Sequence, residues 1–373
     1  MTSTSLSTGD LPVDTSAKSA DAIAPVVDGT EPGCDRGSAY AVLSRQIRAA
    51  KLLQRRRGSY AARITVTGLA LAATWGAVLL VGDSWYQLIV AGVLGVVFTQ
   101  VAFLGHDGGH QQVASRRLSN DTIGLVAGNL LTGLSIGWWV DKHNRHHANP
   151  NKENHDPDIG DGVLTFTTNQ VASRTGRLGK LILRYQAFLF FPLLTLEGLH
   201  LHIASVRWLA GNRAKPHRAV ELGFMALHAA AYFGILLTVL SPITALSFVA
   251  VHQAVFGLYM GCSFAPNHKG MRIVAAEEKL DFLQRQVLTS RNVRGGWLTD
   301  TVLGGLNYQI EHHLFPNMPR PSLRKAQRLV QQYCLEHEIA YTETSLVGSY
   351  AMALGHLHQL GSPLRAAVAT GSS

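Results

Sequence analysis

Seven histidines stand in three short clusters, each with the spacing of residues that share one helix face. The clusters are His106-x-x-x-His110, His143-x-x-His146-His147 and Gln309-x-x-His312-His313. Side chains at positions i, i+3 and i+4 of a helix point the same way, so each cluster presents its members together. Four ligands saturate one zinc ion. Seven imidazoles therefore favour two metal ions, and imidazole suits iron, copper, zinc and nickel.

One His-x-x-x-His pair on a helix is a weak indication of metal binding, but three clusters together are a strong one. Soluble di-iron carboxylate proteins use paired Glu-x-x-His motifs in a helical bundle. This chain has a single Glu-x-x-His, from Glu197 to His200. A shell made mainly of histidine describes the site better than a carboxylate shell.

The composition indicates a membrane protein. Hydrophobic residues make up 47% of the 373 residues and charged residues 15%, against roughly 25% charged in a soluble domain. Cys34, Cys262 and Cys334 have no paired spacing, which argues against a disulfide framework or a thiolate metal site. The net charge of +9 comes with no nucleic-acid-binding motif, so an anionic bilayer surface is the expected partner and nucleic acid is not.

Four apolar segments are long enough to cross a bilayer. They are residues 64–81, 85–105, 221–240 and 242–263. We therefore predict an all-α integral membrane protein with four transmembrane helices in two hairpins. The two short turns, 82–84 and 241–242, carry no Lys or Arg, whereas the other side is basic. The positive-inside rule then puts both termini, the histidine clusters and a helical cap that holds a dimetal site in the cytosol.

Two further apolar stretches, 121–140 and 181–209, are interrupted by polar residues. If either crossed the membrane alone, the histidine clusters would fall on opposite sides. We expect both to lie in the interface or within the cytosolic cap. The domain boundaries that follow are a disordered cytosolic tail at 1–40, a catalytic domain at 41–345 and a C-terminal tail at 346–373. The first segment has no apolar core typical of a signal peptide.

The clusters and their order along the chain resemble the membrane fatty acid desaturases. The third cluster, in Asn307-Tyr308-Gln309-Ile310-Glu311-His312-His313-Leu314-Phe315-Pro316, is similar to that of the front-end and bacterial acyl-CoA desaturases. The resemblance covers roughly residues 60–340. It implies a di-iron centre that activates O₂ and introduces a cis double bond into an acyl chain, carried on CoA or on a lipid. It leaves the position of the double bond open.

The resemblance also implies an eighth ligand, which matches His268. Many front-end relatives carry a fused cytochrome b5 domain with a His-Pro-Gly-Gly haem motif, and this sequence has no such motif. Electrons are therefore expected from a separate ferredoxin, cytochrome b5 or flavoprotein reductase, docked near the basic face.

Several residues beside the clusters have two possible roles each. Asp107 and Gln309 are candidates to orient ligands from outside the metal shell. Asp156 and Asp158 could do the same or lie in a solvated loop. Arg320, Arg324 and Lys325 could meet a CoA or phospholipid phosphate or form a solvated helix face. His228 and His252, near mid-span, could hydrogen-bond to each other or border the buried end of an acyl tunnel.

Two other functions use some of the same features. A membrane hydroxylase or alkane-type monooxygenase would share the histidine-rich site and make an alcohol in place of an alkene. A metal transporter would place histidines inside the spans, whereas here the clusters lie at span ends.

Overall fold

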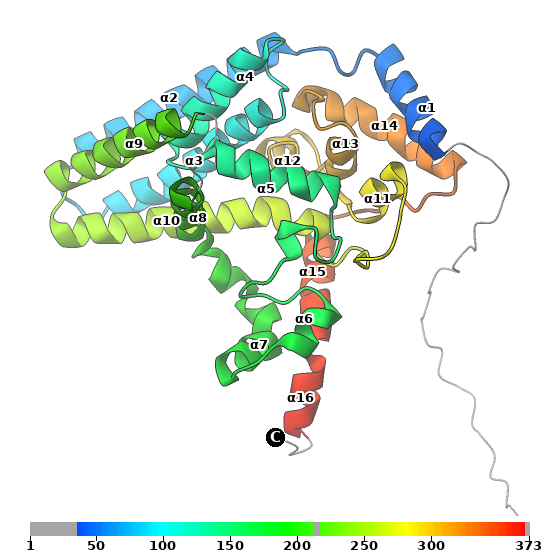
Figure 1. Cartoon of the computed structure of the whole chain (residues 1–373). Coiled ribbons are helices and arrows are strands. Elements are labelled where there is room, and N and C mark those ends of the chain that lie inside the picture. Colours follow the sequence, from blue (N-terminus) through cyan, green and yellow to red (C-terminus); the bar gives the residue numbers. More distant parts are fainter. Residues whose placement is uncertain (1–35, 212–216, 370–373) are drawn as a thin grey trace, which may run out of the picture. The chain divides into compact units, whose positions relative to one another are not determined.

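Four long apolar helices form the part of the structure expected to cross the membrane (Figure 1). The computed structural model describes residues 36–211 and 217–369. Its candidate spans are α2 (Arg57–Val81), α3 (Gln87–Gly109), α9 (Arg218–Val239) and α10 (Pro242–His268). The four predicted spans are thus confirmed as helices. Both α3 and α10 continue beyond their predicted ends, so His106 and His268 lie on the same helices that form the spans.

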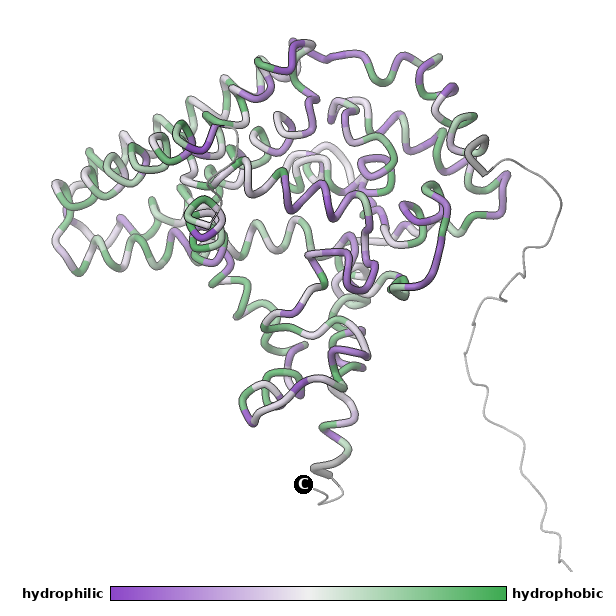
Figure 2. Tube along the Cα trace, in the orientation of Figure 1, coloured by the Kyte–Doolittle hydropathy of each residue, from purple (hydrophilic) through white to green (hydrophobic). Residues whose placement is uncertain are grey.

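The four helices differ in how deeply they are buried. Of the most apolar 18-residue window, 56% is buried in α3 and 39% in α10, but only 17% in α2 and 11% in α9. The two more buried helices, α3 and α10, pack closely against each other. A Cβ added at Gly95 of α3 would lie only 2.9 Å from the backbone of Phe256 in α10. Figure 2 shows hydrophobic residues along all four helices. The exposed leucines of α2 and α9, such as Leu80 and Leu237, therefore face the surroundings that a bilayer would supply.

Local residues set where these helices end. Gly82 ends α2 with a φ of 62°, a left-handed conformation that favours glycine. Ser241 precedes α10, and Pro242 is its first residue, where a missing N–H costs nothing. The Ser241 hydroxyl donates to Asp83 Oδ1 at 3.0 Å. The α2–α3 and α9–α10 turns therefore lie at the same end of the four helices.

Neither of the two additional apolar stretches is one straight helix. The first is α4 (Arg117–Gly124) and a π-helix, η1 (Leu125–Leu131), followed by α5 (Ile136–Ala148) after a bend of 116°. The second is α7 (Arg177–Leu194) and α8 (Glu197–Gly211), bent by 80°. The buried Glu221 carboxylate fixes the first bend by accepting from Asn129, Ser135 and the Gly137 N–H. Because of this bend, α5, which carries the second histidine cluster, runs in a different direction from α4 and η1.

Shorter elements make up the rest of the described chain. They are α1 (Arg36–Ala49), η2 (Pro157–Ile159), α6 (Thr168–Ser173), α11 (Phe282–Leu288), α12 (Trp297–Val302), α13 (Gln309–Leu314), α14 (Arg320–Glu336), α15 (Leu346–Leu360) and α16 (Ser362–Ala369). In the described part of the chain, β1 (Asn292–Val293) and β2 (Glu343–Thr344) form a small parallel pair. An apolar core joins α1, α11, α13 and α14.

The two predicted tails differ from what the structure contains. Residues 1–35 lie outside the described residues, but α1 begins at Arg36, before the expected boundary at 40. After residue 345 the chain continues as α15, which packs against α7 and α10. Pro266 lacks the N–H that would satisfy the Cys262 carbonyl, and the Tyr350 hydroxyl of α15 donates to that carbonyl at 2.7 Å. The α15 helix therefore completes the last turns of α10.

The proposed hydrogen bond between His228 and His252 is wrong. His228 Nδ1 faces the Leu130 carbonyl at 3.0 Å, and His252 Nδ1 faces the Tyr232 hydroxyl at 2.8 Å. The Phe98 ring contacts both imidazoles. Sequence separation gave the depth of the two histidines in the bundle but not the direction in which each ring points.

Gly257 allows α8 and α10 to cross with their backbones in contact, and we predict that a methyl group there destabilises the protein. A Cβ at Gly257 would lie 2.7 Å from the Leu194 carbonyl and would also overlap Gly198. Gly257→Ala should cost roughly 1–3 kcal/mol by overpacking. Its control is Gly234→Ala, where nothing lies within 4 Å and alanine gains up to about 1 kcal/mol of helix propensity. Thermal midpoints in detergent should move in opposite directions, and equal midpoints would contradict the crossing.

Candidate metal centre

The first histidine cluster lies on the last turns of α3. His106 is within the helix and His110 is the residue that ends it. Two glycines between them allow close approach of neighbouring helices. A Cβ at Gly108 would meet the Asn120 carbonyl at 3.0 Å, and one at Gly109 would meet the Trp139 ring. The string His-Asp-Gly-Gly-His therefore places two ligands and makes room for α4 and α5.

The second cluster lies on α5 and the third on the short, fully buried α13. The Ser135 hydroxyl caps α5 by accepting from the Trp138 N–H. Helix α13 has only six residues, so it depends on contacts from outside itself. Asn292 supplies them, because its Oδ1 accepts from the Ile310 N–H and its Nδ2 donates to Glu311 at 2.6 Å.

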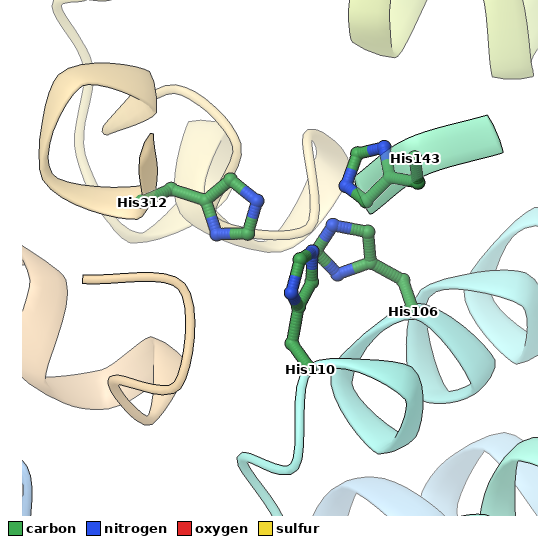
Figure 3. A group of neighbouring side chains, drawn as sticks. All are labelled: His106, His110, His143 and His312. Carbon is green, nitrogen blue, oxygen red and sulfur yellow. The ribbon is translucent and has the colours of Figure 1, made fainter. Parts of the chain in front are cut away.

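The structure gathers seven of the eight predicted ligand histidines into two groups. The first group is His106, His110, His143 and His312, and the second is His146, His268 and His313. Within each group the candidate ligand atoms lie within 4.8 Å of one another. In Figure 3 the four rings of the first group, from α3, α5 and α13, converge on one space. Two groups of this size fit two metal ions.

His147 stands between the two groups. Its Nε2 lies 3.0 Å from His143 Nε2 in the first group. Its ring stacks on His313 of the second group, with the ring centroids 4.1 Å apart. The second cluster therefore contributes one histidine to each group and one between them.

Hydrogen-bond acceptors fix the outer nitrogens of the second group. The Asp156 carboxylate accepts from His146 Nδ1 at 2.9 Å, and the Thr289 carbonyl accepts from His268 Nδ1 at 3.0 Å. Gln286 accepts from His313 Nδ1 at 2.9 Å, and its own amide donates to the His147 carbonyl. Each Nδ1 must carry a proton to donate, so each Nε2 presents a lone pair to the interior.

The inward nitrogens are arranged as a metal requires. His146 Nε2 and His268 Nε2 face each other at 3.3 Å, although both carry lone pairs. Among the described residues, the buried Nε2 atoms of His106, His110, His312 and His313 have no hydrogen-bond partner. Buried polar atoms without partners are costly. A cation shared by these lone pairs removes both the repulsion and the missing bonds, so the residues fit a metal centre.

The protonation of five of the histidines agrees with this arrangement. Burial, together with the neighbouring imidazoles, lowers the pKa of His110, His143, His147, His312 and His313 well below its usual value. They are therefore neutral at pH 7, the form that binds metal. His146 differs, because the carboxylates of Asp156 and Asp158 outweigh its burial and raise its pKa.

Two outer residues named from the sequence lie where they can orient ligands. Asp107 Oδ1 lies 3.2 Å from His106 Nδ1, while its Oδ2 accepts from the Arg320 guanidinium at 2.6 Å. Gln309 Nε2 lies 2.9 Å from His268 Nε2, and its Oε1 accepts from Asn267. Gln309 therefore borders the second group from the position that His143 has in the second cluster.

The structure corrects the interpretation of two other sites. Arg320 is buried and paired with Asp107, so it is not available to a CoA or lipid phosphate, whereas Arg324 and Lys325 are exposed. Asp156 is buried behind His146 and is not a solvated loop residue. The sequence could indicate Asp156 as an orienting residue, because it is a carboxylate only ten residues after His146. Gln286, Thr289 and Asn292 carried no signal, because their spacing has no relation to the clusters.

The fully buried Arg291 ties these positioning residues to the C-terminal helix. Its N–H donates to the Asn267 carbonyl, and its guanidinium donates to the Lys269 carbonyl, on either side of His268. The same guanidinium donates to Ser349 of α15 at 2.7 Å. Segment 289–292 thus holds His268, α13 and α15 in one arrangement.

Comparison with known proteins agrees with this site. A family model described as "Fatty acid desaturase" matches residues 83–345. The chain is 32% identical over 295 residues to Delta(8)-fatty-acid desaturase 2 of Arabidopsis thaliana, covering 76% of this chain and 65% of that protein. It is 31% identical to the acyl-lipid (9-3)-desaturase of Physcomitrium patens (73% and 53% covered). It is also 31% identical to Delta(6)-fatty-acid desaturase fat-3 of Caenorhabditis elegans (76% and 67% covered). The chain thus spans less than two thirds of the length of the first two relatives.

Asp156 provides a test of the second group that does not depend on any reaction. Asp156→Asn removes the charge and one of the acceptor positions that hold His146, Asn151 and Asp158. Loss of such an outer partner typically weakens metal binding roughly 10–100-fold. We expect the variant to lose metal at about tenfold lower chelator concentration, measured by elemental analysis after dialysis. The exposed Asp161→Asn is the control. Equal retention in both variants would show that Asp156 does not position His146.

Proposed function

The chain belongs to the fatty acid desaturase family, and we propose that it is an O₂-dependent fatty acyl desaturase. It introduces a cis double bond into an acyl chain carried by CoA or by a lipid. The observation that carries the proposal is the convergence of seven buried histidines in two groups, four of them with an unpartnered Nε2, at the end of the candidate membrane-spanning helices.

We assign two iron ions to the two histidine groups. His106, His110, His143 and His312 hold one ion, and His146, His268 and His313 hold the other, with His147 between them. Bound there, two irons supply the oxidising power, drawn from O₂ and two external electrons, that removal of hydrogen from an unactivated methylene requires. The overall reaction consumes one O₂, two electrons and two protons for each double bond and releases two waters.

The protein's own residues position the ligands and keep water out. Asp107, Asp156, Thr289 and Gln286 fix the ring orientations before any metal binds, so little reorganisation accompanies the reaction. The rings of Trp139 and Phe264 lie 5.2 and 6.3 Å from the His106 ring. These apolar surfaces are suited to hold methylene groups beside the first group and to exclude solvent.

Electrons are proposed to come from a separate redox protein, such as a ferredoxin, a cytochrome b5 or a flavoprotein reductase. Helices α1 and α14 pack together and expose basic residues, among them Arg45, Arg48, Arg324 and Lys325. A basic face of this kind favours an acidic partner and speeds its encounter.

We propose that the histidine end of the spans and both termini are cytosolic. The basic residues Arg55, Arg56 and Arg57 lie at that end of α2, while Asp83 is the one charged residue in the opposite turns, 82–86 and 240–241. Reporter fusions after Gly82 and after Ser241 should therefore report the outside, and a fusion at Asn151 should report the cytosol. An outside signal at Asn151 would make the bent α4–α5 segment a true crossing and would overturn this topology.

Product analysis tests the activity. Expressed in a host that lacks such an enzyme, the chain should yield new cis-unsaturated fatty acids, located by mass spectrometry, and the purified protein should hold about two irons. His312→Ala should abolish the product while the protein remains in the membrane, because it removes a member of the first group. The exposed His155→Ala is the matched control. An alcohol in place of an alkene would instead identify a hydroxylase, and one metal per fully active chain would refute the dinuclear assignment.

A further inference from the structure

Two adjoining hollows lie between α2 and the α4–η1 segment, away from the histidine groups. The first has a volume of about 490 Å³ and the second about 240 Å³. Ile64 lines both, so the two hollows meet at that residue. Together they form one groove that runs along α2 from its first residue toward the middle of the span.

The first hollow is basic and has no negative charge of its own. Arg57, Arg116, Ser115 and Ser119 contribute its polar groups, and none of its described lining residues is acidic. Arg57 donates to the Ser115 hydroxyl at 3.2 Å. The Arg116 carbonyl accepts from Asn120, but the Arg116 guanidinium has no hydrogen-bond or ion-pair partner within the described residues. Two guanidinium groups and two hydroxyls around one hollow complement a phosphate group.

The second hollow is apolar over its whole length. Its walls are Thr67, Gly68 and Leu71 of α2, Val101 and Leu104 of α3, and Thr122, Ile123, Val126, Ala127 and Leu131 of the opposite segment. On α2 the lining positions 57, 61, 64, 68 and 71 recur every three or four residues and so share one helix face. From Arg57 to Leu71 this face extends about 21 Å at ~1.5 Å per residue. That length covers the headgroup region and one leaflet of a core about 30 Å thick.

We propose that this groove is a binding site for a glycerophospholipid. The phosphate lies between Arg57 and Arg116, and one acyl chain follows the α2 face into the second hollow. The occupant is not the chain to be desaturated, because Leu104 and His106 are two residues apart on α3 and so point about 160° away from each other. The site is therefore additional to the substrate site and does not depend on the proposed reaction.

The position of the groove connects the lipid to the first histidine cluster. Val113 and Ala114 line the first hollow and lie three and four residues after His110, the residue that ends α3. Tyr60, which lines the same hollow, donates to Gln112 at 3.0 Å, and Gln112 donates to the Pro316 carbonyl at 2.7 Å. A bound phospholipid thus packs against the loop that holds the first and third clusters together.

The test uses the full chain, purified in detergent and stripped of lipid. Dioleoyl phosphatidylglycerol, dioleoylglycerol and inorganic phosphate are added separately, and bound lipid is counted by native mass spectrometry alongside the thermal midpoint. Phosphatidylglycerol should bind at least tenfold more tightly than dioleoylglycerol, which has the same chains but no phosphate, and should raise the midpoint. Phosphate alone should leave the midpoint unchanged, since the acyl chain contributes most of the contact.

Three variants make the test specific to the groove. Gly68→Leu projects into the second hollow, where no atom lies within 4 Å of its Cβ, so it fills the groove without a clash. Gly76→Leu is the control on the same helix, also with nothing within 4 Å, and it lines neither hollow. Arg57→Gln with Arg116→Gln removes the phosphate contacts independently. Gly68→Leu and the double variant should each bind phosphatidylglycerol at least fivefold more weakly than Gly76→Leu does. Equal lipid retention in all three variants, equal binding of the two lipids, or a full midpoint shift with phosphate alone would overturn the proposal.

Discussion

Imidazoles can share one buried space stably only if the ring nitrogens that point outward find acceptors and the lone pairs that point inward find a cation. Much of the described fold serves the first half of this condition. Asp107, Asp156, the Thr289 carbonyl and Gln286 each take one outward N–H. The inward lone pairs are then left facing each other, as His146 and His268 do at 3.3 Å. The orientation of the rings is thus built into the protein, and a metal ion bound between them would supply the remaining stabilisation.

This requirement explains why the spans and the cap are not separate modules. Helix α3 carries His106 and ends at His110, and α10 ends at His268, while α5 and α13 bring the other ligands from the cap. Close contacts at Gly95 and Gly257 hold α10 against α3 and α8. A small change in how the helices cross therefore moves ligands at their ends. Stability of the bundle and geometry of the site are coupled through the same two helices.

The sequence predicts the helices and histidine clusters well, because their residues follow a regular spacing. It predicts the bends and connecting segments poorly, because these have no such spacing. Apolar runs of sufficient length gave the four spans, and helical spacing gave the histidines that converge. The bend between η1 and α5 was not predicted, because it depends on Glu221, far away in the chain, accepting from Asn129 and Ser135. The partners of His228 and His252 were missed for a similar reason, since spacing along a helix gives depth but not the neighbour that a ring meets. The orienting residues Gln286 and Thr289 lie in a connecting segment with no periodicity to read.

The contact between α15 and the end of α10 has a consequence for the order of events during biosynthesis. Tyr350 and Ser349 satisfy the Cys262 and Pro266 carbonyls, and Arg291 joins Ser349 to the backbone around His268. Helix α10 ends at His268, and α15 begins only at Leu346. His268 therefore reaches its final position only after α15 has been made. A nascent chain that stops short of α15 lacks these contacts, so its His268 is not held as it is in the folded protein.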